Sequence, residues 1–272
     1  MSFETQPHIR KILVPVDLSP RSAGAAGYAA SLASAFGAEL LFLHVLQNGW
    51  PLGEEERTIR DRISATTCDY RFLFREGSPV PVILHTAAAA EADLILIPTR
   101  GKPALARFVD GSIAAQVLRG APCPVWVGVD NLAPLSSRPI RTALCGLSLG
   151  PRASAVLRWS ADLASRFKAS LAVIHASRGL ESNPGLPCDF EWRYWLKKMA
   201  TEEIRALQAG AGTAAEVWLE SGKPIAAIPP LADHLQADLL VIGKSPQMRF
   251  LADLRTLSYE IALRTSGPVA SV

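Results

Sequence analysis

The sequence contains an internal repeat, with two similar copies in its two halves. Residues 31–44 return with similar residues at 162–175, an offset of 131 positions, and residues 92–97 return at 237–242, an offset of 145. Two offsets indicate one insertion in the second copy, between positions 177 and 221. Each copy takes about half of the 272 residues, so each is a unit of domain size rather than a short solenoid repeat.

The boundary between the copies is a segment without hydrophobic periodicity. It runs from Asp130 to Pro139 and carries two prolines and two serines, as linkers do. We therefore expect a first domain over residues 1–130 and a second over residues 140–272.

Short apolar runs alternate with helical segments in both copies. Strands that are apolar on both faces and alternate with helices indicate a parallel sheet covered on both sides. Right-handed crossovers then predict two tandem doubly wound α/β domains of Rossmann type, each with a five-stranded parallel sheet sandwiched by helices. The expected strands are 11–16, 40–45, 70–74, 94–97, 124–129, 142–147, 171–175, 215–219, 239–242 and 269–272, and the expected helices are 20–36, 54–64, 79–90, 111–119, 152–167, 188–207, 224–235 and 254–264.

Composition excludes several classes of protein. A formal net charge of +3 without a lysine or arginine run argues against nucleic acid as a partner. No apolar stretch approaches the roughly 18 residues that span a bilayer, and residues 1–10 lack the apolar region of a signal peptide. The four cysteines form no C-x-x-C pair, which is typical of reduced thiols, and we expect a cytoplasmic protein.

The polar residues that follow the strands of the first copy form a candidate ligand site. In a doubly wound sheet, ligands bind beyond the carboxyl ends of the strands. Asp17 follows the first strand and can accept a hydrogen bond from an adenine amino group or a ribose hydroxyl. Gly101 allows backbone N–H groups to approach a phosphate, Arg100 adds positive charge, and Gly111 with Ser112 begins a helix whose N-terminus favours anions.

Structural interpretations of the same residues stay open. Asp17 can simply end a strand and precede a helix, and Gly111 with Ser112 can be a helix start without a ligand. His44 and His175 close the second strand of each copy, and this repetition favours a structural histidine over a metal ligand.

The inserted segment carries an aromatic stripe. Trp192, Trp195, Leu196 and Met199 have the i, i+3, i+4, i+7 spacing of a helix face, which predicts that they pack on the second sheet. A ligand lid or a protein-binding surface is the alternative.

The motif residues resemble those of the universal stress protein (UspA) family. Residues 12–17 and residues 111–125 are similar to its first strand and to the helix and strand that end its domain, and the resemblance covers both halves. It implies a five-stranded α/β sandwich that in ATP-binding members carries G-x2-G-x9-G-[ST] after the fourth strand. Matched by position, Asp17, Val45, Gly101, Gly111 and Ser112 would contact the nucleotide.

Both copies depart from that motif, the second more than the first. Pro98 stands at the first glycine of the motif in the first copy and removes a backbone N–H there. In the second copy Ser148 stands at the position of Asp17, Pro246 at the position of Gly101, and no Gly-Ser pair opens the last helix. We therefore expect ATP or a related adenine nucleotide in the first half alone.

The resemblance implies a stress-response regulator rather than an enzyme. The motifs G-x-x-x-x-G-K-[ST] and H-E-x-x-H are absent from the sequence. A scaffold with two degenerate pockets is the first alternative, and a weak ATPase is the second.

Assembly is expected to begin within one chain. Members of the family pair domains through their last strands, here residues 124–127 and 268–272, and an unpaired edge strand favours such pairing. The resemblance thus implies an intramolecular pseudo-dimer, and leaves open a homo-oligomer of whole chains and an unknown protein partner.

Overall fold

The structure is a computed structural model that describes residues 9–17, 20–46, 57, 69–98, 112–128, 134–181, 189–244 and 257–272. The expected helix at 54–64 therefore lies outside the described residues, apart from Arg57.

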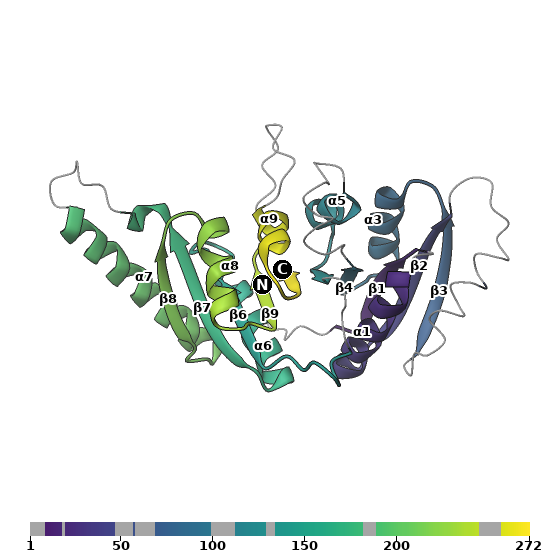
Figure 1. The fold of residues 1–272 in the computed structure, drawn as a ribbon, viewed down its shortest axis with the longest axis horizontal. Coiled ribbons are helices and arrows are strands. Elements are labelled where there is room, and N and C mark those ends of the chain that lie inside the picture. Colours follow the sequence, from purple (N-terminus) through teal and green to yellow (C-terminus); the bar gives the residue numbers. More distant parts are fainter. Residues whose placement is uncertain are drawn as a thin grey trace.

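Both halves contribute strands to one sheet of ten strands. Its order is β3-β2-β1-β4-β5-β10-β9-β6-β7-β8, so each half has the strand order of a doubly wound α/β fold. The sheet runs along the long axis of the molecule, with β3 at one end and β8 at the other (Figure 1). The strands are β1 (Lys11–Val16), β2 (Glu39–Leu46), β3 (Tyr70–Glu76), β4 (Leu94–Pro98), β5 (Val125–Gly128), β6 (Thr142–Gly146), β7 (Ser170–Ser177), β8 (Glu216–Ser221), β9 (Leu239–Ile242) and β10 (Val269–Ser271).

Helices cover both faces of the sheet, each face with its own apolar core. One core joins one side of the sheet to α1 (Pro20–Phe36), α6 (Ala153–Phe167) and α7 (Asp189–Ala211). The other core joins the opposite side to α3 (Pro79–Ala89), α5 (Ile113–Gly120), α8 (Pro224–His234) and α9 (Leu257–Arg264). We call these the first and the second face. A short 3-10 helix, η1 (Arg178–Leu180), follows β7.

The two halves meet at the strands that end them. β5 pairs antiparallel with β10, with Val127 opposite Val269 and Trp126 opposite Ala270, whereas all other pairs in the sheet are parallel. These are the two strands, at residues 124–127 and 268–272, that the sequence analysis expected to pair. Trp126 is fully buried here, and its ring lies 6.4 Å from that of Tyr28 on α1.

The repeated polar residues hold equivalent strands in place. The Asp93 carboxylate accepts hydrogen bonds from the backbone N–H groups of Arg10 and Lys11, at 2.8 and 3.0 Å. Asp238 does the same for Arg141 and Thr142, at 2.9 and 3.1 Å. Each aspartate thus ties the start of β4 or β9 to the start of the neighbouring strand.

The repeated histidines have a structural role. Nδ1 of His44 lies 3.0 Å from the Val16 carbonyl oxygen, and Nδ1 of His175 lies 2.9 Å from that of Leu147. Each ring therefore bridges the ends of adjacent strands, and the structural interpretation of these histidines is confirmed.

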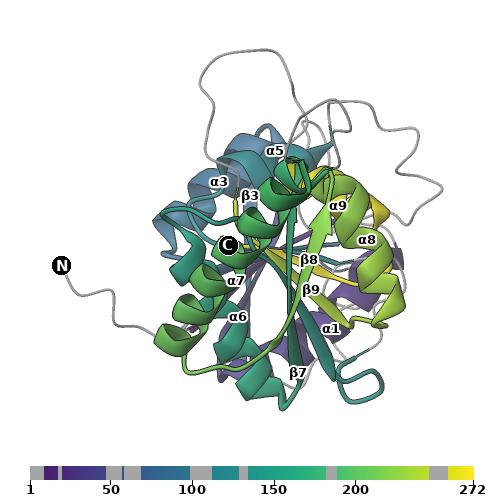
Figure 2. The ribbon, with the colours of Figure 1, turned by 90° about the vertical axis from the view of Figure 1, so that its left-hand side faces the viewer.

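The aromatic stripe of the insertion does not pack on the sheet. Trp192 and Trp195 on α7 are 56% and 55% exposed, and Met199 is 45% exposed, so the predicted core contact is wrong. The helix instead buries Ala200, Ile204 and Gln208, which recur every four residues on another face. Seen from the end of the molecule, β8 lies between α7 and α8 (Figure 2).

Candidate functional site

The candidate site lies where the chain leaves β1 and β4. These adjacent strands are the switch point of the first half, because β2 lies on one side of β1 and β4 on the other. Asp17 directly follows β1 and is exposed. Val45 is half-buried in β2, and Pro98 is the half-buried last residue of β4.

Ser112 begins α5 and is already engaged. Its hydroxyl oxygen accepts a hydrogen bond from the N–H of Ala115 at 3.1 Å, which caps the helix. The same hydroxyl donates to the Tyr259 hydroxyl of α9 at 2.7 Å, across the junction of the two halves. The tyrosine is buried and Ser112 is half-buried, so this bond is partly shielded from water. A phosphate at this helix N-terminus would compete for the donor of Ser112.

Three predicted site residues, Arg100, Gly101 and Gly111, lie outside the described residues. Among the described ones, the structure places Asp17 and Ser112 at the strand and helix ends where the sequence puts them, and Val45 within β2.

Two basic side chains of the second half bind backbone carbonyl oxygens near the ends of β9 and β10. Lys244, two residues after β9, donates from Nζ to the carbonyl oxygens of Ala121 and Cys123, at 2.9 and 2.5 Å. Arg152, at the start of α6, donates to the carbonyl oxygens of Lys244 and Val272, at 3.1 and 2.9 Å. Both cations thus bind the chain's own backbone.

Burial changes the proton affinity of this cluster. Desolvation lowers the pKa of Lys244, and the neighbouring Arg152 charge acts in the same direction. Desolvation raises the pKa of the Cys123 thiol to about 11, so it is neutral at physiological pH. Sequence reasoning missed this cluster, and the one signal for it was the match of Arg152 to Arg21 in the repeat.

The family model of the universal stress protein family matches residues 8–57, 50–128 and 139–258. The chain belongs to this family. A universal stress protein of Methanocaldococcus jannaschii is 30% identical over 137 residues, covering 43% of this chain and 81% of that protein. One of Thermus aquaticus is 35% identical over 131 residues, covering 43% of this chain and 96% of that protein. Each of these two relatives therefore matches about the length of one copy of the repeat.

Solved structures share the tandem fold. A universal stress protein of Archaeoglobus fulgidus superposes with a TM-score of 0.68 at 19% identity, covering 98% of this chain and 97% of that chain. A putative universal stress protein of Pseudomonas aeruginosa gives a TM-score of 0.70 at 19% identity, covering 98% and 94%. At this identity the likeness establishes the fold of both halves together. In the described part of the chain, no helix is long and apolar enough to cross a membrane.

Proposed function

We propose that this universal stress protein binds one adenine nucleotide, ATP or a related one, in its first half, and acts as a nucleotide-responsive factor in the stress response rather than as an enzyme. Membership of the family supports the class of function. The exposed carboxylate of Asp17 at the switch point and the helix N-terminus at Ser112 support the ligand, because one suits an adenosine and the other a phosphate.

The observation that carries the proposal is the difference between the halves at the end of the first strand of each, where the first half has the exposed Asp17 and the second half has Ser148. In the second half, Lys244 and Arg152 also make four hydrogen bonds to backbone carbonyl oxygens near the ends of β9 and β10. A nucleotide that reached these side chains would have to break bonds between charged and polar groups that are partly shielded from water. These features favour a stoichiometry of one.

Two features of the first half weaken binding without preventing it. Pro98 lacks the N–H that a glycine would offer, and one hydrogen bond to a charged group contributes about 1.5–3 kcal/mol. Ser112 must release Tyr259 to donate to a phosphate. The loss at Pro98 alone corresponds to a factor of roughly 10 to 100, so we expect a dissociation constant in the micromolar range or weaker.

Calorimetric titration with ATP tests the proposal. We expect one site per chain, about 10- to 100-fold weaker binding in Asp17→Ala, and unchanged binding in the matched second-half variant Ser148→Ala. Tyr259→Phe should tighten binding several-fold, because it leaves the Ser112 donor available. A stoichiometry of two, or equal effects of the Asp17 and Ser148 variants, would contradict the proposal.

A scaffold without a nucleotide is the second candidate. The engagement of Ser112 with Tyr259 and the proline at position 98 favour it, because both remove donors from the expected phosphate position. Absence of heat with ATP in the natural protein and in Tyr259→Phe alike would select the scaffold.

A further inference from the structure

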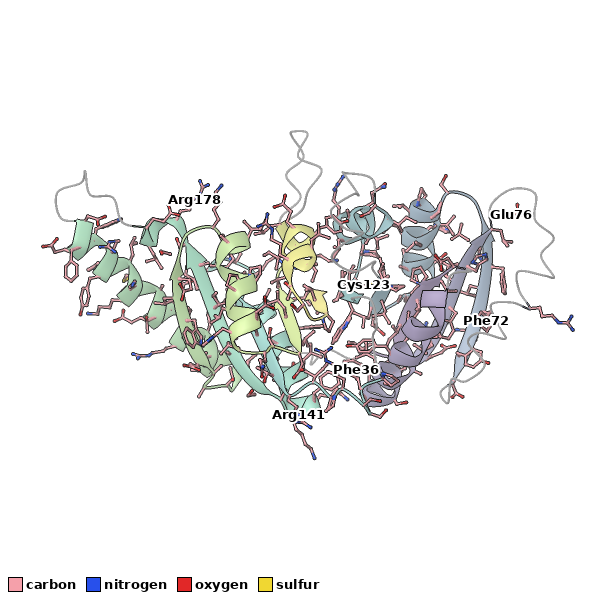
Figure 3. The ribbon with its side chains drawn as sticks, in the orientation of Figure 1. Phe36, Phe72, Glu76, Cys123, Arg141 and Arg178 are labelled. Carbon is pink, nitrogen blue, oxygen red and sulfur yellow. The ribbon has the colours of Figure 1, made fainter. Side chains whose placement is uncertain are left out.

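The two ends of the ten-stranded sheet are edge strands. β3 and β8 are the outermost strands, and within the described residues no strand pairs with the outer side of either. They lie at opposite ends of the long axis, where Figure 3 labels Phe72 and Glu76 on β3. Unpaired edges of this kind bind further strands unless charge or shape prevents it.

The two edges carry opposite charges at equivalent positions of the repeat. Arg71 and Arg75 on β3 correspond, at the offset of 145, to Glu216 and Glu220 on β8. All four lie on the second face, because Arg71 is beside Leu41 in the sheet and Glu216 is beside Ala172, and both of these belong to the core of that face.

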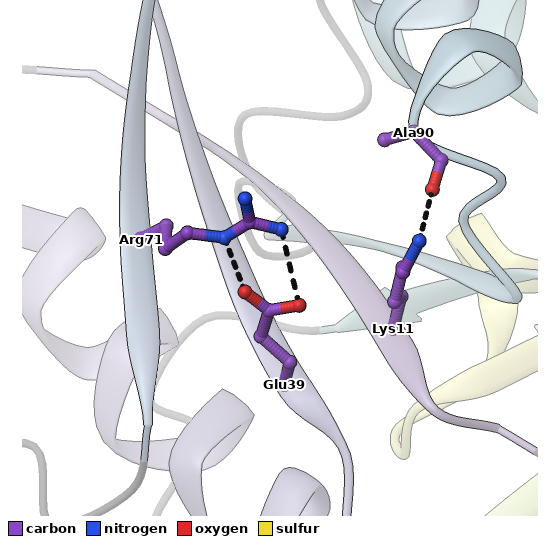
Figure 4. Close-up of polar contacts among 4 residues, drawn as sticks. All are labelled: Lys11, Glu39, Arg71 and Ala90. Atoms are coloured by element: carbon purple, nitrogen blue, oxygen red, sulfur yellow. Dashed lines mark hydrogen bonds and ion pairs between the residues drawn. The ribbon is translucent and has the colours of Figure 1, made fainter.

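The arginines of β3 are accessible. The side chain of Arg71 is 62% exposed and forms a fork with the Glu39 carboxylate, with 3.2 Å between Nη2 and Oε2 (Figure 4). Arg75 is exposed and donates to the carbonyl oxygen of its neighbour Phe74. Each guanidinium has five N–H donors, so both arginines can also donate to a carboxylate of a second copy.

The direction of the strands determines how the two unlike edges meet. β3 and β8 run in opposite directions, because the halves join through the antiparallel pair β5 and β10. When the β3 edge of one copy continues the sheet beyond the β8 edge of another with like faces together, the two strands are antiparallel. In the register that centres Leu73 on Trp218, Arg71 lies opposite Glu220 and Arg75 lies opposite Glu216.

Pairing of like edges is disfavoured in the matching register. Two β3 strands centred on Leu73 would place Arg71 opposite Arg75, and two β8 strands would place Glu216 opposite Glu220. Like charges directly opposite destabilise a strand pair, whereas opposite charges stabilise it. The charges therefore select the pairing of unlike edges.

The first face fits in the same register. Phe72 and Phe74 of β3 fall opposite Leu219 and Val217 of β8. These two β8 residues line an open groove of about 690 Å³ between α7 and β8, together with Thr201, Arg205, Gln208 and Ala215. Phenylalanine side chains from a second copy would meet an apolar wall of this groove.

Further polar complementarity lies along the same groove. Glu76 shares the face of Phe72 and falls opposite Ala215, on the wall that faces Arg205 of α7. Arg205 is exposed, so the groove offers a cation to the Glu76 carboxylate of an incoming strand.

We propose that β3 of one copy adds as an antiparallel strand to β8 of a second copy, so that chains associate head to tail through complementary sheet edges. The contact is heterologous, because two different surfaces meet, and each added copy leaves one free edge of each kind. The assembly is therefore open-ended rather than a closed dimer.

Sedimentation velocity of the full chain over a range of concentrations tests this inference. We expect a weight-average sedimentation coefficient that keeps rising with concentration, and a weaker rise at 1 M salt, where charge pairs are screened. The double variants Arg71→Glu with Arg75→Glu, and Glu216→Arg with Glu220→Arg, should each weaken self-association about tenfold or more.

Mixing the two charge-reversed variants gives the decisive result. Each variant alone presents edges of one sign, but the mixture restores opposite charges at both contacts, so association should return. Arg75→Glu alone, which leaves the pair of Arg71 and Glu39 intact, should give a smaller loss in the same direction. The matched control reverses Arg138 and Arg141, which are exposed at mid-molecule and should have no effect (Figure 3 labels Arg141).

Three results would overturn the inference. The natural chain could remain monomeric at every concentration, it could stop at a dimer, or the mixture of folded variants could associate no better than either variant alone. Circular dichroism melts of each variant establish that it is folded before it is compared.

Discussion

At the scale of single residues, burial decides the chemistry of the described cysteines. Cys145 on β6 is fully buried, and desolvation raises the pKa of its thiol from 9.0 to about 12. The Cys123 thiol is raised to about 11 for the same reason. Between pH 9 and these raised pKa values, each thiol therefore keeps its proton in the folded state, whereas the same thiol has lost it in the unfolded state.

We accordingly expect the free energy of unfolding to fall as pH rises. The thiol contribution is fully present below about pH 9 and is lost as pH approaches 11 to 12, by about 1.4 kcal/mol per pH unit and group. Burial also raises the pKa of Tyr28, which adds to the loss above pH 10. Urea unfolding from pH 7 to pH 11 measures this slope, and Cys145→Ala should reduce it. An unchanged free energy up to pH 11 would contradict the assignment.

At the scale of elements, α7 shows that spacing alone does not decide which helix face is buried. Its sequence carries two stripes of helical spacing, one with Trp192, Trp195 and Met199, the other with Ala200, Ile204 and Gln208. The less hydrophobic stripe faces α6 and the sheet, where Ile204 belongs to the core of the first face, whereas the large rings of the first turns are exposed.

Paired substitutions on α7 test this orientation. Trp195→Ala should change the free energy of unfolding by less than about 1 kcal/mol, since it leaves no cavity. Ile204→Ala, at a position with 0% exposure on the same helix, should cost about 2–5 kcal/mol. Thermal unfolding measures both, and iodide should quench Trp195 fluorescence. A large loss in Trp195→Ala would mean that the ring is covered in solution.

At the scale of the whole molecule, the halves share their cores. The core of the first face contains Leu32 and Phe42 from the first half together with Leu157 and Val241 from the second. Two polar contacts also join the halves at α5 of the first half. Lys244 of the second half binds just after the end of this helix, and Tyr259 binds Ser112 at its start. Neither half can lose its structure without exposing apolar surface of the other.

We therefore expect one cooperative unfolding transition for the chain. Calorimetric and van't Hoff enthalpies should agree, as they do for a single two-state unit. Trp126→Ala, at the fully buried centre of the junction, should lower the midpoint of that one transition, with a cost of about 3–5 kcal/mol. Two resolved transitions, with only one moved by the substitution, would show that the halves unfold separately.

Local pattern was sufficient for the described strands and for the family. Both ends of every strand lie within two residues of the expected range, because strands buried on both faces are short continuous apolar runs. The sequence also predicted the end of β1 before Asp17, the start of α5 after Ser112 and a structural role for His44, since each depends on neighbours in sequence or on an equivalent position in the repeat.

Contacts between the halves required the tertiary structure. That Ser112 binds Tyr259, that Lys244 binds carbonyl oxygens of the first half, and that Trp195 faces outward all depend on residues far apart in the chain. A sequence pattern gives the period of an element and the polarity of its faces. Which face is buried, and which hydroxyl or cation finds a partner, depends on what packs against it when the two copies join into one sheet.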